Sequence, residues 1–263
     1  MITIQHETIA EIPTLHVVKA DLSTQARPTV FFLHGYTSAK EHNLHYAYLL
    51  ADKGFRVLLP EALHHGEREQ ELVGKERDLS FWNIVIQSIK ELELLKNHFV
   101  AQGLTIELQI GVMGTSMGAI TTYGALTQYP WIHTAVSLMG TAYYQAFAEG
   151  QLEMLSKSGI EWSDEAKNKA LSSLETYDLS KQIEKLAGRP LMIWHGERDQ
   201  VVPYRFSPSF YQLIQKQYEE QPEKLLFISD SRADHKVSRE AVLMSVEWFE
   251  THLLKDKIGV SHA

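Results

Sequence analysis

The sequence predicts an α/β protein in which a mostly parallel central sheet carries helices on both faces. Short apolar runs of strand length alternate with longer segments of helical periodicity along most of the chain. Parallel neighbours need crossover connections of this kind. The strand runs are continuously apolar, as expected of strands that are buried on both faces. No repeat or Pro/Gly/Ser-rich linker divides the chain, so we expect residues 1–263 to form a single domain.

Strands are expected where short runs are rich in apolar and β-branched residues. The run Val30-Phe31-Phe32-Leu33 is continuously apolar and ends at His34-Gly35. Pro60 closes the next run, because proline cannot donate a hydrogen bond to a sheet. In chain order, the expected strands cover residues 14–19, 29–33, 55–59, 106–113, 134–139, 191–194 and 225–228.

Helices are expected where apolar residues recur every three or four positions. In the longest such segment Val85, Ile89 and Leu92 have this spacing, and Gly103 ends it. Gly54 similarly follows an earlier helical segment. The expected helices cover residues 41–53, 81–101, 117–128 and 239–253.

Residues 141–186 break the alternation, because they contain helical segments but no convincing strand. We expect a helical insertion that acts as a lid over one edge of the sheet. Its aromatic side chains are candidates for a substrate pocket, since ligand sites are mostly apolar. Packing the insertion onto the sheet is an equally available role for them. The candidates are Tyr143, Tyr144, Phe147 and Trp162.

The composition excludes several classes of function. The chain has 33 acidic against 25 basic residues and a net charge of −8, which disfavours binding to nucleic acid. It has no cysteine, so disulfides, thiolate metal sites and a cysteine nucleophile are excluded. No apolar run approaches the roughly 20 residues of a membrane helix, and Met1–Glu7 does not resemble a secretion signal. We therefore expect a soluble, cytoplasmic protein without a membrane partner.

The strongest local motif is Gly114-Thr115-Ser116-Met117-Gly118. It directly follows a predicted strand and directly precedes a predicted helix. In this setting a G-x-S-x-G motif places its serine on a tight turn with the hydroxyl exposed. The glycines allow the strained turn to pack closely. The alternative, a glycine-rich turn with an ordinary capping serine, accounts less well for this context.

A serine hydroxyl needs a base to take its proton, and the base needs an acid to orient it. His235 follows the last predicted strand and is the candidate base. Asp199 leaves the strand 191–194 at its carboxyl end, where catalytic side chains of open α/β sheets gather. Asp199 is therefore the preferred acid. Glu197, Asp230 and Asp234 are the less favoured alternatives.

The tetrahedral intermediate also needs hydrogen-bond donors for its oxyanion. One is expected to be the backbone N–H of Met117, the residue after the nucleophile. The other is expected from the loop that follows the strand 29–33, and we assign it to the Tyr36 N–H. His34 in the same loop is expected to hold the loop in shape by hydrogen bonding.

These motifs together resemble the α/β-hydrolase superfamily over nearly the whole chain. The chain is most similar to the small esterases related to dienelactone hydrolases and to the catalytic domain of prolyl oligopeptidases. The shared features are His34-Gly35, the turn at Gly114–Gly118, the segment 195–199 and Asp234-His235. The resemblance implies a triad of Ser116, Asp199 and His235, an acyl-enzyme intermediate and no cofactor.

Two departures narrow the expected substrate. Dienelactone hydrolases proper use a cysteine nucleophile, which this chain lacks. Prolyl oligopeptidases carry a large propeller, for which the chain has no room. The predicted function is therefore that of a carboxylesterase acting on small, short-acyl esters. The alternatives are a thioesterase, an acyltransferase or a sugar deacetylase with the same triad, or a catalytically silent fold that binds a small molecule.

Several histidines outside this constellation could suggest a metal site. His42 and His45 lie three residues apart, and His64-His65 adjoin Glu67, but no ligand set with a known spacing emerges. We interpret them as solvated and expect no metal. The loop 61–69 is interpreted as either a border of the substrate pocket or a charged surface loop, and 74–78 as a solvated connection.

Overall fold

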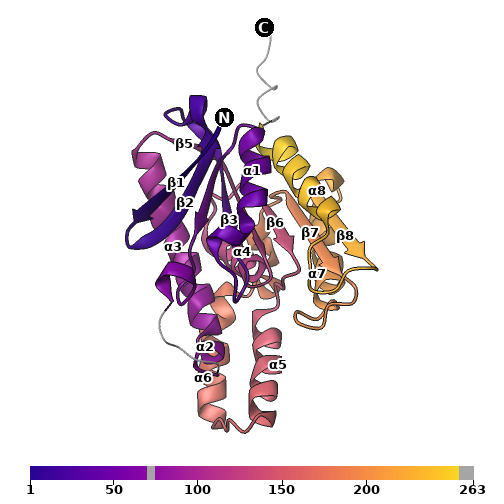
Figure 1. The fold of residues 1–263 in the computed structure, drawn as a ribbon. Coiled ribbons are helices and arrows are strands. Elements are labelled where there is room, and N and C mark those ends of the chain that lie inside the picture. Colours follow the sequence, from indigo (N-terminus) through magenta and orange to yellow (C-terminus); the bar gives the residue numbers. More distant parts are fainter. Residues whose placement is uncertain (70–74, 255–263) are drawn as a thin grey trace.

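The computed structural model describes residues 1–69 and 75–254, which are built around one eight-stranded sheet (Figure 1). Its strand order is β1-β2-β4-β3-β5-β6-β7-β8. β2 is antiparallel to β1 and to β4, and all the other neighbours are parallel. The predicted α/β class is confirmed. The strands are β1 (Ile2–Ile9), β2 (Ile12–Lys19), β3 (Arg27–Leu33), β4 (Arg56–Pro60), β5 (Thr105–Thr115), β6 (Thr134–Leu138), β7 (Leu191–Gly196) and β8 (Leu225–Asp230).

Helices cover both faces of this sheet, because alternate residues of its strands point to opposite sides. In β3, Val30 and Phe32 belong to one apolar core, with α1 and α8. Phe31 and Leu33 belong to the other core, with α3 and α4. None of the helices within the described residues is both long and apolar enough to cross a membrane. The helices on the two faces are α1 (Leu44–Asp52), α3 (Phe81–Ala101), α4 (Met117–Gln128), α7 (Phe206–Ile214) and α8 (Arg239–Phe249).

Three elements differ from the sequence-based expectation. β1 was not expected, and it forms an edge hairpin with β2 through Ala10 and Glu11, both at positive φ. Helix α7 was also not expected; it contains Pro208 in its first turn, where a missing N–H is tolerated. The connection expected at 74–78 includes the short helix α2 (Lys75–Leu79), while Gly74 lies outside the described residues.

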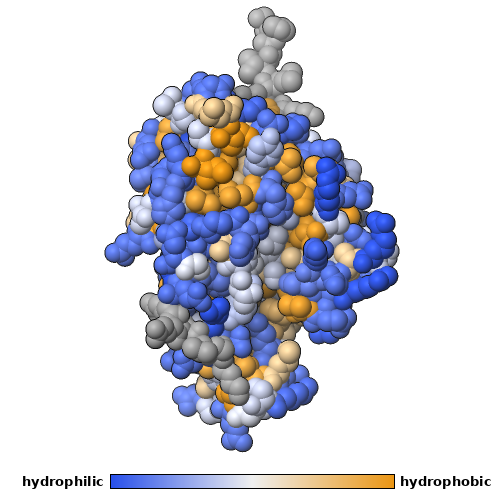
Figure 2. Space-filling model, viewed as in Figure 1, coloured by the Kyte–Doolittle hydropathy of each residue, from blue (hydrophilic) through white to orange (hydrophobic). Residues whose placement is uncertain are grey.

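The segment between β6 and β7 contains two longer helices, α5 (Tyr144–Lys157) and α6 (Asp164–Leu174). They extend from the end of the sheet opposite to the N-terminus (Figure 1). Figure 2 shows that this lower end of the molecule carries a mixture of hydrophilic and apolar residues. Three short 3₁₀ segments between 175 and 186 then return the chain to the sheet.

The carboxyl ends of the parallel strands β3 to β8 meet at one edge of the sheet. The loops that leave this edge contain Tyr36, Ser116, Asp199 and His235. Ligand sites of open α/β sheets form at this edge. The topology therefore gathers the predicted site residues from four distant parts of the chain.

Candidate active site

Ser116 occupies a sharp turn between β5 and α4. Its backbone has φ 53° and ψ −115°, a conformation that non-glycine residues rarely adopt. The Ser116 N–H donates to Leu138 O of the neighbouring strand at 2.9 Å, which fixes the turn to the sheet. The Ser116 hydroxyl makes no capping bond to α4, although the residue stands at the start of the helix. Strain of this kind is typical of functional positions.

Two glycines let the turn pack as closely as it does. A Cβ on Gly114 would lie 2.3 Å from the carbonyl carbon of Gly118. A Cβ on Gly118 would lie 1.9 Å from Leu33 O, at the end of β3. Both contacts are with backbone, which cannot rotate away as a side chain can. The glycine positions of the motif are therefore required by the close approach of α4, β5 and β3.

The structure brings the three predicted catalytic side chains together. Nε2 of His235 lies 2.8 Å from Oγ of Ser116, and Nδ1 of His235 lies 2.6 Å from Oδ2 of Asp199. The Asp199 side chain is fully buried, whereas that of His235 is 23% exposed. This is the geometry in which a base can take the serine proton while an acid fixes its tautomer.

Within the described residues, none of the alternative acids forms a hydrogen bond with His235. Glu197 accepts a hydrogen bond from Ser229, and the Asp230 carboxylate accepts one from the Arg232 N–H. Asp234 is exposed. Of the four carboxylates considered, Asp199 is the one within hydrogen-bonding distance of the imidazole.

Both carboxylate oxygens of Asp199 accept hydrogen bonds from other groups of the protein. Oδ1 accepts from the N–H groups of Val201 and Val202 at 2.8 and 3.0 Å. Oδ2 is shared by His235 and by His195, whose Nε2 lies 3.1 Å away. Burial alone would raise the pKa of Asp199, but the hydrogen bonds from the two histidines outweigh it and hold the pKa well below its usual range. Asp199 is therefore ionised at neutral pH.

The loop that follows β3 lies directly against the serine. A Cβ on Gly35 would be 3.5 Å from Cβ of Ser116, so Tyr36 begins beside this serine. Within the described residues, neither the Tyr36 N–H nor the Met117 N–H donates a hydrogen bond to a backbone carbonyl of a turn or loop. Both N–H groups remain candidates for binding an oxyanion.

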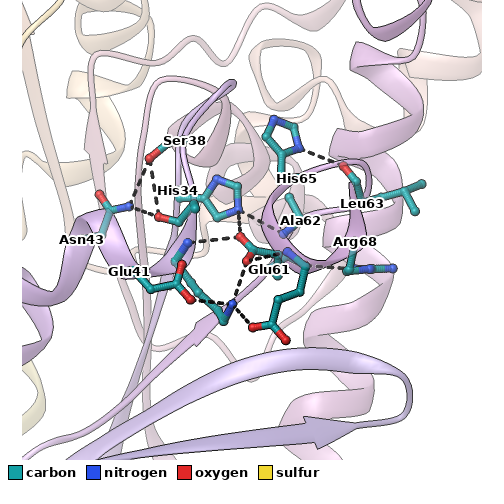
Figure 3. Close-up of polar contacts among 12 residues, drawn as sticks. His34, Ser38, Glu41, Asn43, Glu61, Ala62, Leu63, His65 and Arg68 are labelled. Carbon is teal, nitrogen blue, oxygen red and sulfur yellow. Dashed lines mark hydrogen bonds and ion pairs between the residues drawn. The ribbon is translucent and has the colours of Figure 1, made fainter. Parts of the chain in front are cut away.

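We call residues 34–38, after β3, the candidate oxyanion loop. A second loop, residues 61–68 after β4, holds it in place (Figure 3). The Ala62 N–H donates to Nε2 of His34 at 3.0 Å, and Nδ1 of His34 lies 2.9 Å from Gly35 O. The Thr37 N–H donates to Nε2 of His65 at 3.1 Å. Thr37 has φ 61°, so this bond secures a strained residue next to Tyr36. The structural role expected for His34 is confirmed by these contacts.

Glu61 and Lys40 form a fully buried ion pair. Nζ of Lys40 lies 2.8 Å from Oε2 of Glu61, and the Lys40 N–H donates to Oε1 at 3.1 Å. Burial alone would raise the pKa of Glu61, but its contacts with His34 and Lys40 lower it to about 2. Burial alone would lower the pKa of Lys40, but the hydrogen bonds that it donates to the surrounding glutamates outweigh burial and raise it.

The same contacts explain the one acidic cluster within the described residues that has the dimensions of a metal site. It consists of Glu41, Glu61 and Glu67. Nζ of Lys40 lies 2.7, 2.8 and 2.5 Å from these three carboxylates, in the place a cation would take.

One interpretation made from the sequence was wrong for this region, because His65 is buried and not solvated. The loop 61–69 is mixed: Glu61 is buried, whereas Glu67 and Glu69 are exposed, as in a charged surface loop. His42 and His45 are exposed, as expected. The importance of Glu61, His65 and Lys40 was missed because contacts between two loops leave no periodic signal in a sequence.

The four aromatic candidates of the insertion lie in different environments. The rings of Tyr143 and Phe147 are partly buried, and each contacts the ring of Phe206. Tyr144 is fully buried, and its hydroxyl donates to Ile120 O at 2.5 Å. Tyr144 therefore packs the insertion onto α4 instead of facing a ligand. Trp162 lies beyond the end of α5 and has no ring contact with the other three among the described residues.

The fold and this constellation define the class of protein, a serine hydrolase of the α/β-hydrolase superfamily. A solved structure from Thermus thermophilus, TT1662, has the same fold, with a TM-score of 0.72 at 19% identity. The superposition covers 96% of this chain and 98% of that one. The likeness confirms the expected fold.

The chain belongs to the prolyl oligopeptidase family, whose sequence pattern matches residues 42–259. It is 52% identical over 255 residues to a protein named putative esterase YitV of Bacillus subtilis (strain 168). It is 30% identical over 254 residues to a protein named esterase YjfP of Escherichia coli (strain K12). Each comparison covers 96% of this chain and the full length of the relative.

Proposed function

We propose that the protein is a carboxylesterase that hydrolyses small esters through an acyl-enzyme on Ser116. The observation that carries the proposal is the continuous hydrogen-bonded chain from Ser116 through His235 to Asp199. The names of the two relatives support ester hydrolysis as the reaction. A small-molecule ester is the proposed substrate, and no cofactor takes part in the proposed steps.

In the first half-reaction, Nε2 of His235 takes the proton of Ser116 while Oγ attacks the ester carbonyl carbon. Asp199 holds the proton on Nδ1 of His235 and stabilises the imidazolium without taking that proton. The N–H groups of Tyr36 and Met117 donate to the oxyanion. When the intermediate collapses, the bond to the alcohol oxygen breaks, and His235 gives its proton to the leaving alkoxide.

In the second half-reaction, water replaces the alcohol. His235 takes a proton from this water as it attacks the acyl carbon, and the same two N–H groups bind the second oxyanion. Collapse breaks the bond to Oγ, and His235 returns the proton to Ser116. The products are a carboxylic acid, an alcohol and the free enzyme.

The proposed lining for the acyl group is a layer of aromatic rings. Tyr36 of the oxyanion loop contacts Phe81, Phe81 contacts Phe147, and Phe147 contacts Phe206, with ring centroids 5.7, 6.3 and 6.3 Å apart. Tyr143 stacks on Phe206 at 5.6 Å. The layer joins the oxyanion loop to the insertion, so the insertion is suited to select the acyl chain. Short acyl chains are the proposed preference.

The test is hydrolysis of p-nitrophenyl esters from acetyl to octanoyl by the wild type and by Ser116→Ala. Loss of the nucleophile is expected to lower kcat by roughly 10⁶, as in a well-studied serine protease. Ser173→Ala, on the exposed part of α6, is the matched control and should retain full activity.

Equal hydrolysis by the wild type and Ser116→Ala would exclude Ser116 as the nucleophile. Hydrolysis of thioesters but not of oxygen esters would favour a thioesterase, and transfer to added alcohols would favour an acyltransferase. Tight ligand binding without turnover would favour a silent binding protein.

A further inference from the structure

His195 is a buried histidine that the proposed reaction steps do not use. It lies in β7, its side chain is fully buried, and it is four residues before Asp199. Its Nε2 lies 3.1 Å from Oδ2 of Asp199, the same oxygen that receives His235. Two imidazoles thus share one carboxylate oxygen, although the proposed chemistry needs only one.

The contacts of His195 determine where its proton is. Nε2 faces two acceptors, the Asp199 carboxylate and Val202 O at 2.9 Å, so this nitrogen carries the hydrogen. Nδ1 lies 2.6 Å from the hydroxyl of Ser207 in α7, which is also buried. The hydroxyl can donate to the Nδ1 lone pair of a neutral ring. With the Ser207 hydroxyl donating to Nδ1, the contacts of His195 favour the tautomer with its hydrogen on Nε2.

The surroundings of His195 contain few other ionisable groups. Tyr204, just before α7, meets the His195 ring edge-on with centroids 5.8 Å apart. The Tyr204 hydroxyl contacts Ser229, which in turn donates to Glu197. Asp199 is the one ionised group with a described hydrogen bond to His195.

We propose that His195 is a positioning residue for the hydrolysis reaction, which holds Oδ2 of Asp199 so that this carboxylate orients His235 correctly. The inference rests on the proposed function, because it concerns the same base. Oδ1 is already fixed by two backbone N–H groups, so His195 fixes the remaining oxygen. A donor on Oδ2 also draws charge away from His235, which weakens the stabilisation of its imidazolium.

The direction of the expected pH effect follows from the contact of both histidines with Oδ2 of Asp199. His235 must be neutral to act as a base, so activity is lost on the acid side when it is protonated. Without the His195 N–H, the full charge of Oδ2 stabilises the imidazolium. The acid limb of the kcat/KM profile should then move to higher pH.

The test compares His195→Leu, which removes the donor, with His195→Gln, whose amide N–H₂ can occupy the position of Nε2–H. In His195→Leu, kcat should fall roughly 10- to 100-fold with little change in KM, as expected when one hydrogen bond to a charged group is lost. The acid limb of the kcat/KM profile should move to higher pH. His195→Gln should restore most of kcat and the wild-type limb.

If His195→Leu does not fold, His195→Gln and Ser207→Ala decide the question. Ser207→Ala releases Nδ1 and should move the acid limb in the same direction by a smaller amount. Equal losses in the Leu and Gln variants with an unchanged acid limb would overturn the proposal, because that is the result of a purely structural role. Wild-type behaviour of His195→Leu would overturn it as well.

A measurement without substrate separates this inference from the proposed function. The titration midpoint of the His235 Cε1–H resonance can be followed by NMR in the wild type, His195→Leu and His195→Gln. An upward shift in the Leu variant alone supports the role of His195 even where no ester is turned over. An unchanged midpoint in both variants contradicts it, whatever the activity.

Discussion

Helices α4 and α5 both border the site, but they are held in very different ways. Eleven of the twelve residues of α4 are buried, from Met117 to Thr127. Of the fourteen residues of α5, Tyr144 and Ala148 are the two that are buried, both in its first turns. The helix that begins after Ser116 is enclosed on all sides, whereas α5 is buried only in its first turns.

Because of this difference, we expect the two regions to have different roles: one in folding and turnover, the other in the choice of substrate. Ser116, the glycines beside it and the oxyanion loop depend on close packing and on buried charges, so small changes there should affect folding or turnover. The distal part of the insertion has few contacts to lose, so changes there should affect the choice of substrate. The following substitutions test this contrast in matched pairs.

The largest effect on stability is expected from Gly118→Ala, compared with Gly150→Ala in α5. The added Cβ at 118 would lie 1.9 Å from Leu33 O, whereas nothing lies within 4 Å of one at 150. We expect Gly118→Ala to lower the free energy of unfolding by about 3 kcal/mol or more. Gly150→Ala should raise it by about 0.5–1 kcal/mol, since alanine favours a helix interior. Urea denaturation measures both, and similar effects of the two substitutions would contradict the contrast.

The next largest effect is expected from Glu61→Gln, compared with Glu41→Gln. Both carboxylates bind Lys40, but that of Glu61 is fully buried and that of Glu41 is half exposed. Breaking the buried pair should lower the free energy of unfolding by about 3 kcal/mol at neutral pH. Breaking the exposed pair should change it by less than about 1 kcal/mol.

The Glu61 effect should also depend on pH in a defined direction. Its pKa is lowered from the ordinary 4.5 to about 2 in the folded protein, so ionised Glu61 stabilises the fold above pH 4.5. This stability is lost as the pH falls through 4.5 toward 2. The difference between the wild type and Glu61→Gln, measured by urea denaturation, should shrink over this window. A difference that is constant from pH 7 to pH 3 would show that the charge of Glu61 is not its cause.

The smallest effect is expected within the insertion itself. Phe147 contacts Phe81 and Phe206 near the base of α5, whereas Met154 on the same helix is 72% exposed. Phe147→Ala should change the ratio of kcat/KM for octanoyl to acetyl esters by roughly 10-fold, the effect of altering an apolar pocket. Met154→Ala should leave the ratio unchanged. An unchanged ratio in Phe147→Ala would place the acyl pocket elsewhere.

The central strands and helices could be predicted because their signals are local. The apolar run at Val30–Leu33 and the helical spacing over Phe81–Ala101 both correspond to elements of the structure. β1 was missed because an edge strand is half exposed and lacks such a run. Helix α7 was missed because Pro208 reads as a helix breaker, although the first turn tolerates it.

In the candidate site, too, some residues could be predicted from the sequence and others could not. Ser116 could be assigned from a motif and its context, and His235 and Asp199 from the order of strands and loops. The interaction of His195 with Asp199, and that of Glu61 with Lys40, could not be assigned. The first contact joins β7 to the loop that follows it, and the second joins two separate segments. Both depend on side-chain geometry, which no spacing in the chain encodes.

The most direct test of the central claim is covalent labelling by a fluorophosphonate, which phosphonylates an activated serine Oγ with loss of fluoride. Intact mass and peptide mapping would locate the adduct in the wild type and in Ser116→Ala. We expect one adduct per chain, on Ser116, and none in the variant. An adduct on another residue, or equal labelling of both proteins, would contradict the assignment of Ser116 as the nucleophile.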